Sequence, residues 1–104
     1  MQQMQPEKNF QPLVSVVIPL YNESVSVSRI IKEVLSQPSV AEVIVVDDYS
    51  TDYSLDVVKK MATQDARIFF YCHTRNLGKG AALRTGISKA SAPIVFNPRR
   101  RSRI

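Results

Sequence analysis

The chain has 104 residues, of which 44% are hydrophobic, and it carries a formal net charge of +5 at pH 7. This length is sufficient for one domain with a modest core, and the apolar share excludes disorder over most of the chain. The single cysteine, Cys72, excludes an internal disulfide, and we expect it to be a small buried residue at a strand end.

The positive charge is concentrated near the C-terminus. Four arginines lie within the last six residues, and without them the net charge falls from +5 to +1. The remainder shows no basic face interleaved with aromatic side chains, which is the pattern typical of nucleic-acid binding. We therefore expect no nucleic-acid partner.

Residues 1–12 are polar and are expected to form a disordered leader. They lack the basic and then apolar pattern of a signal peptide. No apolar run in the sequence approaches the roughly 20 residues that a membrane-spanning helix needs. These features predict a cytoplasmic protein with no membrane segment in this chain.

Residues 13–96 alternate between strand and helix patterns. Strands are predicted at 13–20, 42–46, 67–72 and 93–96, and the first two are nearly continuous apolar runs, typical of buried parallel strands. Helical spacing of apolar residues predicts helices between them, with Asn22 or Ser24 as N-cap of the first and Asp52 of the second. The residues expected to face inward are Val27, Ile30, Ile31, Val34 and Leu35, then Leu55, Val58 and Ala62, then Leu83, Ile87 and Ala90. This β-α-β-α-β-α-β order predicts an α/β fold, a Rossmann-like half-domain with a parallel sheet.

Two strand-end motifs, Val16–Glu23 and Val43–Asp52, indicate a binding site, because ligands of open α/β sheets sit beyond the carboxyl ends of the strands. Pro19 suits a strand end, Tyr21 offers a flat face for a base, and Glu23 offers an acceptor. The alternative interpretation of this segment is a turn followed by a helix cap.

In the second motif, adjacent side chains point in opposite directions, so Asp47 and Asp48 cannot form a catalytic dyad. One should face the crevice and the other should brace the next loop.

The segment from Asn76 to Ala82 is a Gly-rich turn before the third predicted helix. Such a turn can hold a phosphate through exposed N–H groups, and Lys79 would add charge. The spacing matches neither a Walker A loop nor a dinucleotide fingerprint, and the alternative is that these glycines let the helix pack closely on the sheet. His73 is the only histidine and has no acidic or cysteine partners at ligand spacing, so we expect no metal site.

These motifs resemble those of the inverting family 2 glycosyltransferases, which have the GT-A fold, from about Leu13 to Phe96. The resemblance implies that 13–96 is the N-terminal, nucleotide-binding part of such a domain, with Asp47 structural. Many members have glycine in place of Tyr49, so Tyr49 is strained if its position requires a positive φ. The residues that correspond to nucleotide contacts in the family are Pro19, Tyr21, Glu23, Val46 through its backbone, Asp48 and Lys79.

The resemblance also implies a reaction: inverting transfer of a hexose from a UDP- or GDP-linked sugar, with a polyprenyl phosphate as the expected acceptor. It implies that the full-length family member uses Mg or Mn. It also implies that this full-length protein acts at the cytoplasmic face of the membrane. After the fourth strand, members of the family carry an Asp-x-Asp motif for the metal and the diphosphate, and later a catalytic base.

In this chain, residues 97–104 are rich in arginine and contain no carboxylate. We therefore predict a truncated fragment with no catalytic or metal-binding residue, inactive alone. One set of codons for these residues reads Ile-Gln-Asp-Ala-Asp in a shifted frame, so we interpret the tail as the product of a frameshift. The alternative function is a non-catalytic nucleotide-binding fragment. A receiver-type signalling domain is less consistent, because its acidic pair would follow the first strand.

Overall fold

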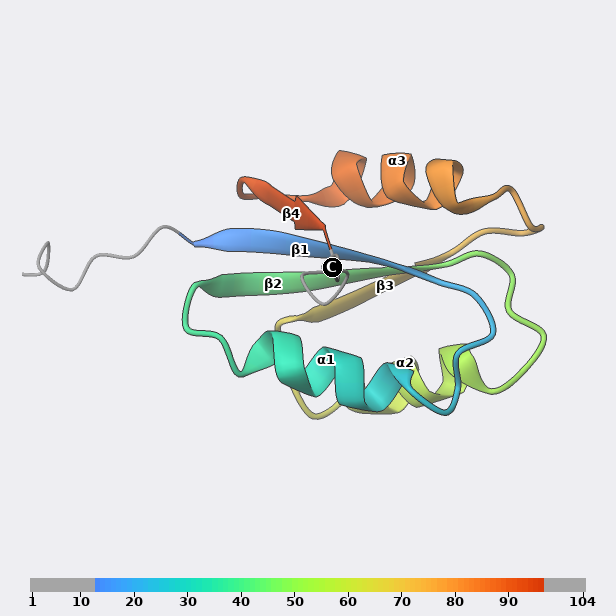
Figure 1. Ribbon diagram of the computed structural model, residues 1–104, viewed down its shortest axis with the longest axis horizontal. Coiled ribbons are helices and arrows are strands. Elements are labelled where there is room, and N and C mark those ends of the chain that lie inside the picture. The colour runs from blue at the N-terminus through green and yellow to red at the C-terminus, as the bar shows by residue number, and fades with distance from the viewer. Residues whose placement is uncertain (1–12, 97–104) are drawn as a thin grey trace, which may run out of the picture.

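The computed structural model describes residues 13–96, and the predictions for 1–12 and 97–104 lie outside these residues. Strands and helices alternate along the chain (Figure 1). Their bounds are β1 (Val14–Leu20), α1 (Val27–Leu35), β2 (Val40–Asp47), α2 (Ser54–Ala62), β3 (Ile68–Cys72), α3 (Lys79–Lys89) and β4 (Ile94–Phe96). Among the described residues, no helix is long and apolar enough to cross a bilayer.

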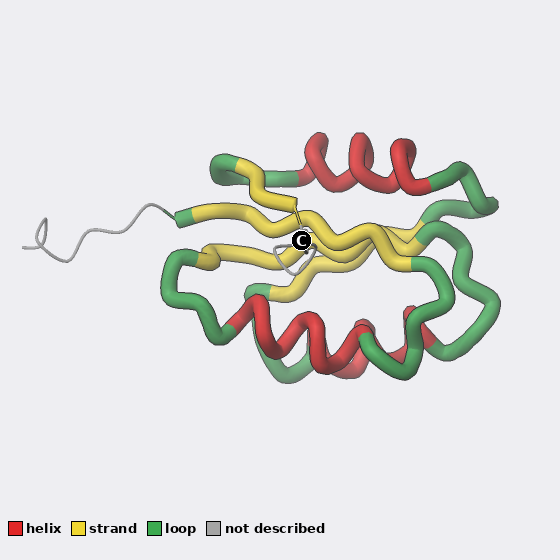
Figure 2. The backbone as a smooth tube through the Cα atoms, in the orientation of Figure 1, coloured by secondary structure: helices red, strands yellow, loops and turns green. Residues whose placement is uncertain are grey.

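The four strands form one parallel sheet in the order β3-β2-β1-β4. β1 and β2 lie at its centre, and Leu20 pairs with Asp47 where both strands end. Helices α1 and α2 cover one face of the sheet and α3 covers the other, so the molecule has three layers (Figure 2). The predicted α/β, Rossmann-like arrangement with parallel strands is confirmed.

The larger part of the core lies between the sheet and helices α1 and α2. The predicted stripe of α1 is confirmed, with Val27, Ile30, Ile31 and Val34 buried and Leu35 half-buried. In α2 the buried apolar residue is Val58, and Ala62 packs against the same cluster. These side chains pack on residues of alternate positions in the strands, which are Val16, Ile18, Leu20, Val43 and Val45.

Helix α3 packs only partly as predicted: Ala90, just after its end, contacts the core, but the helix itself presents other residues to the sheet. Its buried residues are Ala82 and Gly86, whereas Ile87 is 42% exposed and Leu83 is only half-buried. The reason is the close approach of α3 to the sheet: a Cβ atom at Gly86 would overlap Cγ1 of Val17 and lie 3.2 Å from its Cγ2. The smallest side chains therefore face the sheet, and the larger ones are turned aside.

This close approach predicts that Gly86→Ala destabilises the fold. The new methyl group would force α3 away from β1, and overpacking of this kind typically costs about 1–3 kcal/mol. The matched control is Gly80→Ala in the same helix, where a Cβ would meet only the Arg84 side chain at 3.6 Å. The control should leave stability unchanged or raise it by up to about 1 kcal/mol. Urea unfolding of both variants measures the difference, and equal stabilities would contradict the close packing.

Cys72 also differs from the prediction. It is exposed, because β3 is an edge strand of the sheet and Cys72 is its last residue. The prediction of burial assumed a strand covered on both faces along its whole length.

At the amino ends of the central strands, the Glu42 carboxylate joins three segments. Its Oε2 accepts hydrogen bonds from the hydroxyl of Ser15 at 2.5 Å and from the N–H and hydroxyl of Ser91 at 2.8 and 2.9 Å. Burial alone would raise the pKa of Glu42, but these hydrogen bonds outweigh it and the pKa is lowered. Glu42 thus fixes the connection that brings β4 beside β1.

Candidate functional site

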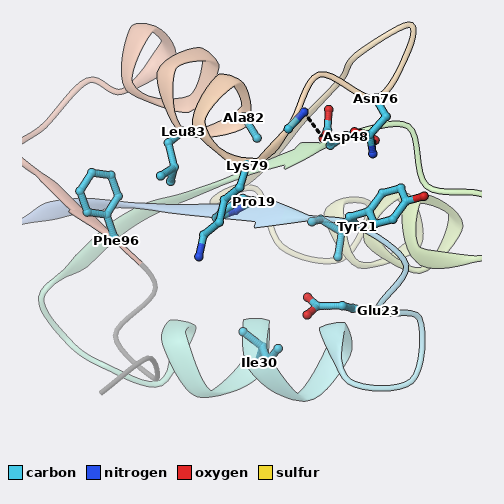
Figure 3. A pocket seen from close by; sticks show the side chains of 12 residues that line it. Pro19, Tyr21, Glu23, Ile30, Asp48, Asn76, Lys79, Ala82, Leu83 and Phe96 are labelled. Atoms are coloured by element: carbon cyan, nitrogen blue, oxygen red, sulfur yellow. Dashed lines mark hydrogen bonds between the residues drawn. The ribbon is translucent and has the colours of Figure 1, made fainter. Parts of the chain in front are cut away.

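A pocket of about 850 Å³ lies beside the carboxyl end of β1, between α1 and α3 (Figure 3). One part of its wall is polar and carries two carboxylates and an ammonium group. The other part is apolar and is formed by residues of β1, α1, α3 and β4. The lining residues are Pro19, Leu20, Tyr21, Glu23, Ile30, Asp48, Asn76, Gly78, Lys79, Ala82, Leu83 and Phe96.

The structure brings together most of the residues that were singled out as nucleotide contacts. The pocket is lined by Pro19, Tyr21, Glu23, Asp48 and Lys79. Val46 is different. Its side chain is completely buried in a small cluster with Ile44 and Ala82 beneath α3, and it does not line the pocket. In the sheet Val46 lies between Pro19 of β1 and Tyr71 of β3, so a contact through its backbone stays a prediction.

The loop after β1 is held by the loop after β2. The N–H of Asn22 donates to Ser50 Oγ at 2.9 Å, and Asn22 Oδ1 accepts from the N–H of Thr51 at 2.8 Å. The N–H of Glu23 donates to the buried Ser54 Oγ at 2.7 Å. We call this set of bonds the β1–β2 loop contact. It places Tyr21 and Glu23 at the pocket without using any side chain of either residue.

The β1–β2 loop contact also changes the assignment of the helix caps. α1 begins at Val27 with Ser26 at the N-cap position, so the prediction of Asn22 or Ser24 as its cap is wrong. Both residues bond across to the β2–α2 loop instead, and Ser24 donates to Asp52 Oδ2 at 3.2 Å.

The other oxygen of Asp52 accepts the N–H of Ser54, the first residue of α2, at 2.9 Å. The prediction of Asp52 as N-cap is wrong, because Tyr53 occupies that position and makes no side-chain cap bond. Asp52 holds the start of α2 from one residue earlier. Hydrogen bonds from the side chain and backbone of Ser54, together with those from Ser24, outweigh desolvation and lower the pKa of Asp52.

Tyr49 has a φ of 69°, in the left-handed region that non-glycine residues rarely adopt. The condition on which strain at Tyr49 was predicted, a positive φ, is therefore met. The turn lets Asp47 Oδ2 accept the N–H of Ser50 at 3.1 Å, while Asp48 is directed to the opposite side. Asp47 thus braces the following loop and Asp48 faces the pocket, which is the division of roles predicted for the pair.

Asp48 is only 4% exposed, and its carboxylate is held by three donors. Oδ1 accepts from Nδ1 of His73 and from the N–H of Leu77, both at 2.8 Å. Oδ2 accepts from the N–H of Gly78, also at 2.8 Å. Burial alone would raise the pKa of Asp48, but the bonds from Leu77, His73 and Gly78 outweigh it, so the pKa is lowered. A charged carboxylate therefore lines the pocket and also orders the loop before α3.

The hydrogen bonds to Asp48 determine whether the Gly-rich turn can hold a phosphate. The N–H groups of Leu77 and Gly78 are occupied by Asp48 and are not exposed to a phosphate. Gly78 has a φ of 97°, which explains the choice of glycine, and a Cβ there would meet nothing within 4 Å. The interpretation that Gly78 and Gly80 allow close packing is therefore wrong, since Gly86 has that role. Lys79, the first residue of α3, extends over the pocket beside β1 in Figure 3.

The described residues do not fit a divalent metal ion. No group of three or more His, Cys, Asp or Glu side chains within 13–96 could hold one. His73 is bonded to Asp48 and Thr85, and Asp48 already accepts three hydrogen bonds from the protein.

Several lining residues were not singled out from the sequence. Asn76 was part of the Gly-rich motif but had no assigned role. Its Nδ2 donates to the carbonyl oxygen of Asp48 at 3.2 Å, which ties the two loops together. The apolar wall of Ile30, Leu83 and Phe96 comes from three elements and carries no local sequence signal.

A parallel α/β sheet with a partly polar pocket at the carboxyl ends of its strands defines a ligand-binding domain of the open-sheet class. The profile of one family, Glycosyl transferase family 2, matches residues 15–97. The chain belongs to this family.

Relatives and solved structures agree with this assignment. The chain is 32% identical over 88 residues to an undecaprenyl-phosphate 4-deoxy-4-formamido-L-arabinose transferase of Edwardsiella ictaluri, covering 80% of this chain and 27% of the relative. It is similar to the mannosyltransferase PcManGT from Pyrobaculum calidifontis, solved with GDP-Man and Mn²⁺, with a TM-score of 0.71, 28% identity, and coverage of 79% and 25% of the two chains. A structure of S. aureus TarS in complex with UDP gives a TM-score of 0.70 and 25% identity, with 82% and 27% covered.

The predicted similarity to GT-A glycosyltransferases is thereby confirmed. The chain spans between 26% and 34% of the length of four curated relatives. The match thus covers only one part of these glycosyltransferases, as the resemblance implied.

Proposed function

We propose that residues 13–96 are the nucleotide-binding part of a nucleotide-sugar-dependent, inverting glycosyltransferase whose donor is a UDP- or GDP-linked hexose. The observation that carries this proposal is the pocket itself, where Tyr21, Glu23, Asp48 and Lys79 converge from the ends of β1 and β2 and the start of α3. The 47% exposed Tyr21 is available to stack on a base. Asp48 would accept a base N–H, Glu23 the ribose hydroxyls, and Lys79 would face the diphosphate.

The relatives support the choice of donor and acceptor. One structural neighbour was solved with GDP-Man and another with UDP, and a relative is named as an undecaprenyl-phosphate sugar transferase. We therefore propose a polyprenyl phosphate as acceptor, which would place the full-length protein at the cytoplasmic face of a membrane. The ligands of Mg or Mn would be residues of the longer enzyme outside 13–96, because the side chains of 13–96 do not form a metal site.

We further propose that this chain alone binds a nucleotide but transfers no sugar. Transfer needs electrostatic stabilisation of the leaving diphosphate and a base that deprotonates the acceptor. Asp48 is fixed by three protein donors. With Asp48 assigned to the base and Glu23 to the ribose hydroxyls, neither carboxylate is available for these tasks. Sugar transfer by the purified chain would contradict the proposal that it is inactive.

Sequencing the coding DNA across Phe96–Ile104 tests the frameshift, and a confirmed in-frame stop would favour the non-catalytic fragment.

The proposed function predicts that Tyr21→Ala weakens nucleotide binding. Loss of the stacking ring is expected to raise the Kd for UDP or GDP about 5- to 100-fold, measured by calorimetric titration of the purified chain. Tyr53→Ala is the matched control, because Tyr53 is 75% exposed and lies outside the pocket lining. The proposal fails if neither nucleotide binds the unaltered chain, or if the two variants bind equally well.

A further inference from the structure

His73 connects the pocket to helix α3 although it does not itself line the pocket. Its side chain is 10% exposed, and both ring nitrogens are bonded. Nδ1 lies 2.8 Å from Asp48 Oδ1, and Nε2 lies 2.8 Å from the hydroxyl oxygen of Thr85 in the middle of α3. A continuous chain of hydrogen bonds therefore runs from α3 through His73 to the pocket carboxylate.

The chemistry of Asp48 fixes the proton on Nδ1 of His73. An ionised carboxylate only accepts hydrogen bonds, so the proton must be on Nδ1 of His73. In the neutral ring, Nε2 is then an acceptor, and the Thr85 hydroxyl is the donor that satisfies it. The neutral Nδ1–H tautomer satisfies both contacts.

The bond from His73 Nδ1 also helps to set the orientation of the Asp48 carboxylate toward a ligand. A carboxylate has about four acceptor positions, and three are filled by His73, Leu77 and Gly78. Donors on both oxygens define the plane of the group, which leaves one acceptor position on a residue that lines the pocket. Leu77 and Gly78 donate through their backbones, so His73 is the one donor whose identity depends on a side chain.

We propose that His73 is a positioning residue that, together with Thr85, orients the Asp48 carboxylate to accept a hydrogen bond from a nucleobase N–H. The ligand in this statement rests on the proposed function, whereas the orientation of Asp48 does not. His73 does not touch the ligand and acts only through Asp48.

The composition of the chain allows a direct test by NMR, since the sequence has one histidine and three glycines. The ¹⁵N shifts of the unaltered chain at pH 8 should show His73 as the Nδ1–H tautomer. The Gly78 amide should be protected from solvent exchange, because it donates to Asp48. An Nε2–H tautomer would overturn the proposal without reference to any nucleotide or variant.

Two substitutions separate the donor from the bulk of the ring. His73→Asn can keep an N–H group close to the position of Nδ1, whereas His73→Leu keeps comparable volume without a donor. We expect His73→Leu to raise the Kd for UDP or GDP about tenfold and to increase exchange at Gly78. His73→Asn should remain within about threefold of the unaltered chain. Ser88→Ala is the control on α3. The Ser88 hydroxyl donates to the backbone carbonyl of Thr85, whereas His73 is bonded to the Thr85 side chain.

Equal loss of affinity in folded His73→Asn and His73→Leu would show that the ring acts by packing, and would overturn the proposal. So would unchanged affinity in both. If the unaltered chain binds neither UDP nor GDP, the proposed function fails, while the tautomer and the Gly78 exchange still decide whether His73 orients Asp48.

Discussion

Replacement of Asp48 by asparagine is expected to abolish measurable nucleotide binding and to lower the free energy of unfolding by about 1–3 kcal/mol. The neutral amide presents an NH₂ group in place of one carboxylate oxygen. Either the N–H of Leu77 or that of Gly78 would then face another donor inside a buried site. Calorimetry with UDP and GDP measures the first effect, and urea unfolding measures the second.

The effect of Asp48→Asn on stability should depend on pH in a defined direction. The pKa of Asp48 is lowered in the folded chain, so its contribution is complete above the unfolded value of about 3.9 and is lost as the pH falls through the folded value. The gap in unfolding free energy between the unaltered chain and the variant should be constant near neutral pH and narrow below about pH 4. Asp56→Asn, in the first turn of α2, is the control and should change stability by less than about 1 kcal/mol. A gap that widens on acidification would contradict the assigned role of Asp48.

The second large effect is expected for Ile31→Ala in the core. Ile31 is completely buried between α1 and the sheet, and removal of such a side chain typically costs about 2–5 kcal/mol. Domains of this kind are stable by about 5–15 kcal/mol in total, so a large part of the stability would be lost. Thermal and urea unfolding measure the change.

Val25→Ala is the matched control for Ile31→Ala, because Val25 is 97% exposed in the loop before α1. It should change the free energy of unfolding by less than about 0.5 kcal/mol. Comparable losses in the two variants would mean that the core does not lie where the structure places it.

The sequence predicts this fold well where burial follows a regular period. The stripe of α1 and the apolar runs of β1 and β2 are set by local spacing, and the structure confirms them. The prediction failed for α3, because the distance between a helix and a sheet is a tertiary property. Gly86 faces Val17 and thereby excludes Ile87 from the core, and no periodicity of α3 alone reveals this.

A similar limit applies to the pocket. Residues at the ends of strands, such as Tyr21 and Asp48, could be singled out because their position in the motif implies where they lie. The apolar wall, which includes Ile30 and Phe96, joins positions far apart in the sequence. The hydrogen bond between His73 and Asp48 spans 25 positions, and a lone histidine at a strand end carries no signal for such a partner.

The β1–β2 loop contact has a consequence for the kinetics of ligand entry. Loops that bear ligand-binding groups commonly lose conformational freedom when a ligand arrives, and this ordering weakens binding. Here Asn22 and Glu23 are held by bonds to Ser50, Thr51 and Ser54, all made within the chain itself. Most of that entropy is therefore lost during folding. Association with this site should be a single-step encounter, its rate set by diffusion and orientation and not by a slow rearrangement of the loops.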